Sequence, residues 1–263
     1  KDMKQFQNFE EENIDYWTGR TDGYSTVNQE ELFSDQKTVW GRVLTEKIKA
    51  HFPEKAPEEI QVLDIGTGPG FFAILLTEKG YQVNAVDYTA SMLEAARKNA
   101  GELAEKIRFQ QMNAEELTFA SDSFDVIVTR NLTWNLHHPE KAYGEWARVL
   151  KPNGLLLNFD ANWYRYLWDE AAEQGHKADR QNLGTSDVRD ETEGTDVEAM
   201  EAIARQTPLS GQQRPSWDLE VLQKAGVEAA ADTEIWKEVW TREERINNAS
   251  TPMFLVEGVK KNA

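Results

Sequence analysis

The sequence predicts an α/β protein built on a mostly parallel sheet. The main observation is the order of segments in residues 62–76. A short apolar run at 62–65 is followed by three glycines at alternate positions and then by a second apolar run at 71–76. This order is typical of a strand, a tight turn and a helix. Short apolar runs then alternate with helical segments up to residue 160, as in βαβ units. The length of 263 residues suits one domain with a well-buried core.

The elements of the predicted core follow one another closely. A helix over 71–79 ends at Gly80, a residue suited to the position after a helix. The later predicted strands are 81–86, 107–111, 124–128 and 155–159, and the predicted helices between them are 91–100 and 140–150. A helix over 217–226 and two strands over 227–240 and 251–259 complete the chain.

The segments around this core divide the single domain into four parts. Residues 1–57 form an N-terminal helical extension, in which helical spacing is clearest from Val39 onward, and residues 58–160 form the nucleotide-binding core. Residues 161–215 begin with an aromatic-rich segment and are polar and acidic from 169 onward, and we expect them to form a helical cap inserted over a substrate pocket. Residues 216–263 supply the last part of the sheet.

The composition excludes several classes of partner and chemistry. The net charge of −17 argues against a nucleic-acid partner and against an anionic membrane surface. The absence of cysteine removes disulfides, thiolate nucleophiles and cysteine zinc sites. No apolar run approaches membrane-spanning length, and residues 1–5 are too polar for a signal peptide, so we expect a cytoplasmic protein that needs no membrane.

The glycine turn indicates which nucleotide the core binds. Gly66, Gly68 and Gly70 give the order G-x-G-x-G, whereas the dinucleotide fingerprint is G-x-G-x-x-G, and Phe71 stands at its last position. No Lys-Ser or Lys-Thr follows, which excludes the phosphate loop of nucleotide triphosphatases. Asp64 precedes the turn and suits a cationic ligand better than a pyrophosphate.

The segment from Asp64 to Gly70 resembles the first motif of the class I S-adenosylmethionine (SAM) dependent methyltransferases. The turn of residues 151–154, Lys-Pro-Asn-Gly, is similar to that family's Lys-Pro-Gly-Gly, and Asn tolerates the left-handed conformation nearly as well as Gly. The resemblance covers residues 55–160 best and is nearest to the small-molecule, ubiquinone- and menaquinone-biosynthesis type. It implies a Rossmann-like, seven-stranded sheet whose last strand is antiparallel.

Asp87 is the first candidate for a specific contact with the cofactor. It lies at the end of the second predicted strand, 21 residues after Gly66, where a carboxylate can accept hydrogen bonds from both ribose hydroxyls. The resemblance places Met92, Asn113 and Ala114 around the adenine, with Asn113 standing where the family usually has Asp. Taken together, the residues that we expect to bind SAM are Tyr16, Tyr24, Asp64, Gly66, Thr67, Gly68, Asp87, Tyr88, Met92, Asn113, Ala114, Glu115, Arg130 and Asn131.

Aromatic residues gather ahead of the core and after its fifth predicted strand. Tyr16, Trp17, Arg20 and Tyr24 resemble the segment that closes over the cofactor in many small-molecule methyltransferases, although they could equally anchor the extension to the core. Aromatic side chains can bind a flat or cationic acceptor by stacking or cation–π contact. The alternative role for these residues is ordinary packing in the core. The residues expected at the acceptor are Trp17, Trp134, Asp160, Trp163 and Tyr164, with Trp168 as a further candidate for its wall.

His137 and His138 are the candidate general bases. They are two of the four histidines and lie on the loop that follows the fourth predicted strand. Either could take a proton from an acceptor hydroxyl or amine. The alternative is structural: His138 begins the helix ahead of Pro139, and His137 packs beneath it. Adjacent histidines rarely bind one ion, so we expect no metal.

The expected function is methyl transfer from SAM to a small molecule by a monomer or homodimer. A non-catalytic SAM-binding protein and an NAD-dependent oxidoreductase are the alternatives. The incomplete dinucleotide fingerprint and Asp64 count against the oxidoreductase. A protein or nucleic-acid methyltransferase is disfavoured by the charge and by the expected cap.

Overall fold

The computed structural model describes residues 9–262, and the expectation for residues 1–5 lies outside them. The core is one seven-stranded sheet in the order β3-β2-β1-β4-β5-β7-β6. The strands are β1 (Gln61–Ile65), β2 (Gln82–Asp87), β3 (Ile107–Gln111), β4 (Phe124–Arg130), β5 (Leu150–Asp160), β6 (Val227–Asp232) and β7 (Phe254–Lys260). The predicted α/β, Rossmann-like sheet with an antiparallel last strand is confirmed.

The sheet changes its winding direction between β1 and β4. These strands pair in parallel, with Val62 opposite Val126 and Asp64 opposite Val128. From β1 the sheet runs outward through β2 and β3, and from β4 it runs outward through β5. β7 is inserted antiparallel between β5 and β6. Open α/β sheets bind ligands beyond the carboxyl ends of the strands at such a switch point.

Helices cover both faces of the sheet because its strands alternate between two apolar faces. The helices are α1 (Phe9–Leu32), α2 (Asp35–His51), α3 (Phe71–Glu78), α4 (Ala90–Ala100), α5 (Pro139–Val149), α6 (Glu170–Gly184), α7 (Val197–Ala204), α8 (Ser216–Lys224), α9 (Trp236–Val239) and α10 (Arg242–Asn247). Val62 of β1 packs into the cluster under α2 and α3, whereas Leu63 and Ile65 pack into the cluster under α5 and α8. Each strand therefore presents one residue in two to each layer.

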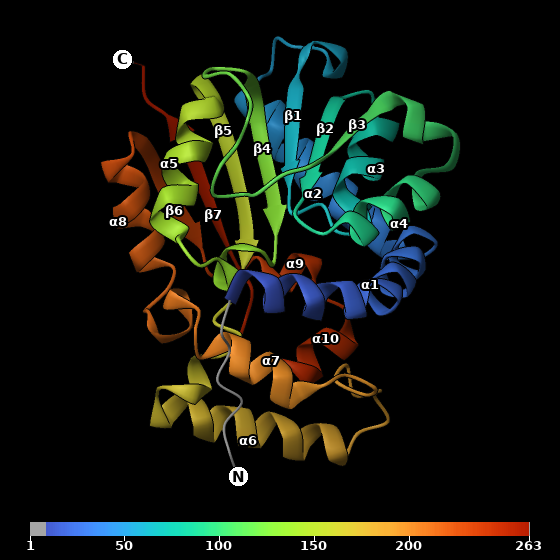
Figure 1. The fold of residues 1–263 in the computed structure, drawn as a ribbon, viewed down its shortest axis with the longest axis vertical. Helices are drawn as coiled ribbons and strands as arrows, with labels where there is room; N and C mark the ends of the chain where they lie inside the picture. The colour runs from blue at the N-terminus through green and yellow to red at the C-terminus, as the bar shows by residue number, and fades with distance from the viewer. Residues whose placement is uncertain (1–8, 263) are drawn as a thin grey trace.

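The N-terminal extension and the cap lie at the carboxyl edge of the sheet. Figure 1 shows α1 crossing the ends of the strands, with α6, α7 and α10 forming a further layer beyond it. The predicted cap over 161–215 contains α6, α7 and two short 3₁₀ turns. In the part of the chain that the structure describes, no helix is long and apolar enough to cross a membrane.

One predicted strand is wrong over most of its length. The strand expected over 227–240 ends at Asp232, and the chain then forms α9 and α10 before β7 begins at Phe254. Ile235 and Val239 are four residues apart, as are Trp236 and Trp240, which is helical spacing. Ile235, Val239 and Trp240 are buried in the cluster under α2, and this packing stabilises the helix.

Candidate functional site

The glycine turn adopts the left-handed conformation at each of its three glycines. Gly66, Gly68 and Gly70 have φ angles of 67°, 54° and 92°. A Cβ on Gly66 would lie 3.0 Å from Leu132, and one on Gly70 would lie 3.0 Å from Ala96. A Cβ on Gly68 would meet nothing within 4 Å, so the middle of the turn presents bare backbone to open space. Such a backbone is suited to close contact with a ligand.

Two carboxylates, one buried and one partly buried, flank this turn from neighbouring strands. Asp64 of β1 accepts a hydrogen bond from the Thr67 hydroxyl at 2.7 Å, and burial raises the pKa of Asp64 to about 7. Asp87 of β2 accepts from the backbone N–H of Gly68 and of Thr89, each at 2.9 Å. Burial also raises the pKa of Asp87. The two acids that the sequence singled out therefore meet at one glycine loop.

The residues expected near the adenine follow β2 and β3. Met92 is buried at the start of α4, while Tyr88 beside it is 39% exposed. The side-chain oxygen of Asn113 accepts from the backbone N–H of Glu115 at 2.9 Å and thereby shapes the segment after β3. The indole of Trp146 donates to the Ala114 carbonyl at 2.9 Å, a support that the sequence did not indicate.

Arg130 is the last residue of β4, and Asn131 follows it beside the glycine turn. The Arg130 guanidinium lies over the rings of Trp40, Phe71 and Phe72, with centroid distances of 4.9 to 5.2 Å, and pairs with a carboxylate from α1. Asn131 has a φ of 58°, and its buried side-chain oxygen has no hydrogen-bond partner among the described residues. Within the described part of the chain, this oxygen therefore remains an unpaired acceptor buried at the switch point.

Aromatic residues from α1, the loop after β4 and the cap meet at the same edge. The Trp17 ring lies 5.3 Å from Tyr24 and 6.4 Å from Trp134. Trp134 in turn lies 5.0 Å from Tyr164, and Tyr16 packs against the same cluster. The structure thus brings together these five predicted aromatic residues. Trp163 packs against the same cluster and also stacks on Trp240 at 6.2 Å, whereas Trp168 is 56% exposed.

The two candidate bases differ in their surroundings. The His137 ring stacks on Phe9 of α1 at 4.8 Å, and its Nδ1 atom is buried without a hydrogen-bond partner among the described residues. His138 is exposed at the position before α5, and its backbone N–H donates to Glu115 at 2.5 Å. Both line a cavity of about 570 Å³ together with Leu209 and other residues of the cap end. His137 is therefore the more enclosed of the pair.

A buried cluster of charged side chains, which the sequence did not indicate, holds the loop that contains Trp134 in place. Asp160 accepts from the backbone N–H of Trp134 at 2.9 Å and from Arg214 at 2.7 Å. Arg214 also forms two hydrogen bonds with Asp218, which accepts a third from Tyr143. All three charged side chains are at most 1% exposed. The only signal in the sequence was the i,i+4 spacing of Arg214 and Asp218.

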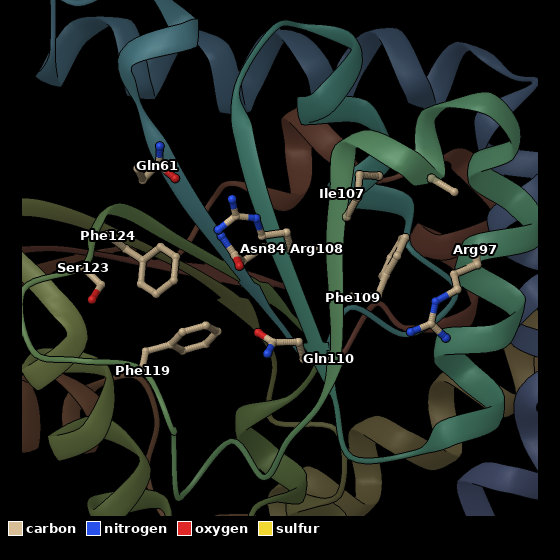
Figure 2. Close-up of a pocket in the computed structure, with 11 residues that line it drawn as sticks. Gln61, Asn84, Arg97, Ile107, Arg108, Phe109, Gln110, Phe119, Ser123 and Phe124 are labelled. Atoms are coloured by element: carbon tan, nitrogen blue, oxygen red, sulfur yellow. The ribbon is translucent and has the colours of Figure 1, made fainter.

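Another cavity, of about 690 Å³, lies away from the carboxyl edge. Its walls include Gln61, Ile107 and Phe124, which begin β1, β3 and β4, and Figure 2 shows Arg108 and Phe119 beside them. It shares no residue with the glycine turn or with the aromatic cluster. We assign it no part in the candidate site.

Comparison with known proteins identifies a domain match over the middle of the chain. Residues 63–158 match the family model described as methyltransferase domain. An uncharacterized methyltransferase of Bacillus subtilis, YcgJ, is 42% identical over 103 residues, which are 39% of this chain and 41% of that protein. A demethylmenaquinone methyltransferase of Thermus thermophilus is 38% identical over 106 residues, or 40% of this chain and 47% of that protein. The match thus spans less than half the length of either curated relative.

Solved structures extend the similarity of fold beyond the matched segment. The crystal structure of YcgJ covers 81% of this chain and 97% of its own, with a TM-score of 0.53 and 22% identity. A Haemonchus contortus phosphoethanolamine N-methyltransferase in complex with SAM covers 82% of this chain and 51% of its own, with a TM-score of 0.53 and 17% identity. At these identities the likeness concerns the fold alone. The segment that matches the methyltransferase domain model, residues 63–158, contains the glycine turn and both flanking carboxylates.

Proposed function

We propose that this protein transfers the methyl group of SAM to a small-molecule acceptor. The observation that carries the proposal is the junction of Asp64, the open face of Gly68 and Asp87 at the switch point between β1 and β4. A bare backbone with an acid on either side fits a ligand with an amino-acid end and a ribose. The dinucleotide fingerprint is absent, and the matched family is a methyltransferase one.

The residues of the site would hold the two ends of SAM separately. Asp64, Gly66, Thr67 and Gly68 would hold the methionine part, and Asp87 would accept hydrogen bonds from the ribose. Tyr88, Met92, Asn113, Ala114 and Glu115 would surround the adenine, while Tyr16, Tyr24, Arg130 and Asn131 would complete the site from α1 and β4.

When bound, SAM supplies a methyl group on a positively charged sulfur, which already activates the carbon for in-line displacement. The protein then mainly has to align the acceptor and exclude water. Trp17, Trp134 and Tyr164 lie in one cluster under α1 and the cap, and this arrangement supports both roles. A cap of this kind favours a small acceptor over a macromolecule.

His137 is the better candidate for a general base, because it is enclosed and its Nδ1 atom has no partner among the described residues. His138 is exposed and begins α5, and Asp160 is engaged by Arg214. We therefore propose that Asp160 orients the Trp134 loop, and that Trp163 supports the cluster from the Trp240 side.

Isothermal titration tests the proposal directly. The purified protein is titrated in parallel with SAM, S-adenosylhomocysteine and NAD. We expect micromolar binding of the first two and no heat from NAD. Tight NAD binding without a SAM signal would overturn the assignment. Consumption of SAM once a candidate acceptor is supplied would then separate an enzyme from a non-catalytic SAM-binding protein.

A further inference from the structure

The ion pair between Glu31 and Arg130 lies at the methionine side of the proposed cofactor site. The Glu31 carboxylate accepts from both terminal nitrogens of Arg130, at 2.9 and 3.1 Å. The two side chains are 17% and 18% exposed. Arg130 lies on the same face of the sheet as Asp64, because it is two residues beyond Val128, the β-sheet partner of Asp64. A carboxylate from α1 is thus already paired with Arg130, the cation whose charge acts on Asp64.

Glu31 is placed where a carboxylate is intrinsically unfavourable. It lies in the last turn of α1, where the helix dipole favours positive charge, and that turn contains no basic residue. The ion pair with Arg130 therefore offsets the unfavourable interaction between the Glu31 carboxylate and the helix dipole. One turn earlier, the side-chain oxygen of Asn28 accepts from the backbone N–H of Phe71 at 3.2 Å. Side chains at the end of α1 consequently bind two groups that could otherwise bind an anion. These are the guanidinium of Arg130 and the first backbone N–H of α3.

The contacts that hold α1 over the site combine the aromatic packing of Phe9, Tyr16 and Trp17 with polar contacts. The only residues of α1 that are buried are Thr21 and Asn28. Thr21 exchanges a hydrogen bond with Ser91 at 2.7 Å, and Gln29 donates to Asn99 at 2.9 Å. These two hydrogen bonds, unlike the aromatic packing of α1, can be exchanged for hydrogen bonds to water at little net cost. The chain bends directly after α1, where Phe33 is 91% exposed.

We propose that Glu31 is an internal competitor for Arg130: it holds the position of the cofactor's α-carboxylate, and SAM binding transfers Arg130 from Glu31 to that carboxylate. The inference rests on the proposed function and adds to it a regulatory contact. It makes the end of α1 the part of the chain that senses occupancy of the site. Because part of the binding energy must separate Glu31 from Arg130, the apparent affinity for carboxylate-bearing ligands is lowered.

The test compares two ligands on two variants. S-Adenosylhomocysteine carries the α-carboxylate, whereas 5′-methylthioadenosine keeps the adenosine and the sulfur but lacks the amino-acid end. Glu31→Gln removes the competing charge. Glu30→Gln is the matched control, because it removes the same charge from an exposed neighbour on the same helix. Titration calorimetry gives each Kd, and thermal unfolding without ligand confirms that both variants are folded.

We expect Glu31→Gln to tighten S-adenosylhomocysteine binding by about threefold to tenfold and to leave 5′-methylthioadenosine unchanged. Glu30→Gln should alter neither Kd. Weaker or unchanged S-adenosylhomocysteine binding in Glu31→Gln, or an equal change for both ligands, would overturn the inference while leaving the cofactor assignment intact. If the unaltered protein binds neither ligand, the proposed function itself fails and the inference fails with it.

Discussion

Asp64 has a buried carboxyl group, which we propose binds the positively charged end of SAM. Burial raises its pKa to about 7, so the folded protein retains a proton that the unfolded chain releases from about pH 4 upward. The unfolded state then binds fewer protons, and this group makes stability fall as the pH rises from about 4 to 7. A cation bound beside Asp64 lowers the pKa of this group again, because it favours the ionised carboxylate.

We therefore predict that SAM affinity rises with pH up to about 7 and levels off above it. Calorimetry across this range, repeated in buffers of different ionisation enthalpy, should show proton release on binding. Asp64→Asn should bind more weakly and lose the pH dependence. A pH profile that is the same in this variant would remove Asp64 from the cofactor site.

Asp87 is predicted to carry the ribose contact. Asp87→Ala should weaken SAM binding by about 1–3 kcal/mol, because charge-assisted hydrogen bonds are lost. Glu94→Ala, an exposed acid on α4, is the control for charge alone. Equal affinities of the Asp87→Ala variant and the unaltered protein in calorimetry would refute the ribose role.

At the scale of elements, two glycines of the same turn have different roles. Gly68 faces open space, whereas Gly70 packs against α4. Gly68 and Gly70 both have positive φ, so alanine at either costs about 1–2 kcal/mol of backbone strain. Only at Gly70 does the new Cβ also press on α4, 3.0 Å from the Ala96 side chain. The two substitutions should therefore have different effects.

We predict that Gly70→Ala lowers the melting temperature more than Gly68→Ala does, while Gly68→Ala weakens SAM binding more, by roughly tenfold or beyond. Thermal unfolding and calorimetry on both variants measure the two effects. The opposite ranking in either measurement would mean that the open face of Gly68 is not the ligand face.

For the whole molecule, the Arg214 cluster joins the Trp134 loop, β5 and the segment 214–218, which are distant from one another in sequence. It links the end of the cap to β5 through Asp160, to α8 through Asp218, and to the Trp134 loop through the Asp160 carboxylate. A buried ion pair is costly to break from one side, because the remaining charges stay desolvated.

Arg214→Met is predicted to lower the free energy of unfolding by about 3–5 kcal/mol, since it leaves Asp160 and Asp218 without their cation. Arg242→Met, which breaks an exposed pair with Asp187, should have no measurable effect. Urea denaturation compares the two variants. Similar midpoints would show that the cluster does not stabilise the fold.

The sequence by itself determined the sheet, the glycine turn and the acids beside it. Each depends on local patterns: alternating burial defines strands, glycines permit positive φ, and a residue at the end of a parallel strand must lie at the carboxyl edge. Tertiary packing decided that the predicted strand over 227–240 ends at Asp232 and continues into α9, because Ile235, Val239 and Trp240 are buried in the cluster under α2. It also decided the pairs Arg130–Glu31 and Asp160–Arg214, which are 99 and 54 residues apart. No local pattern specifies such partners, because they are chosen by the layers that bring α1 and the cap onto one edge of the sheet.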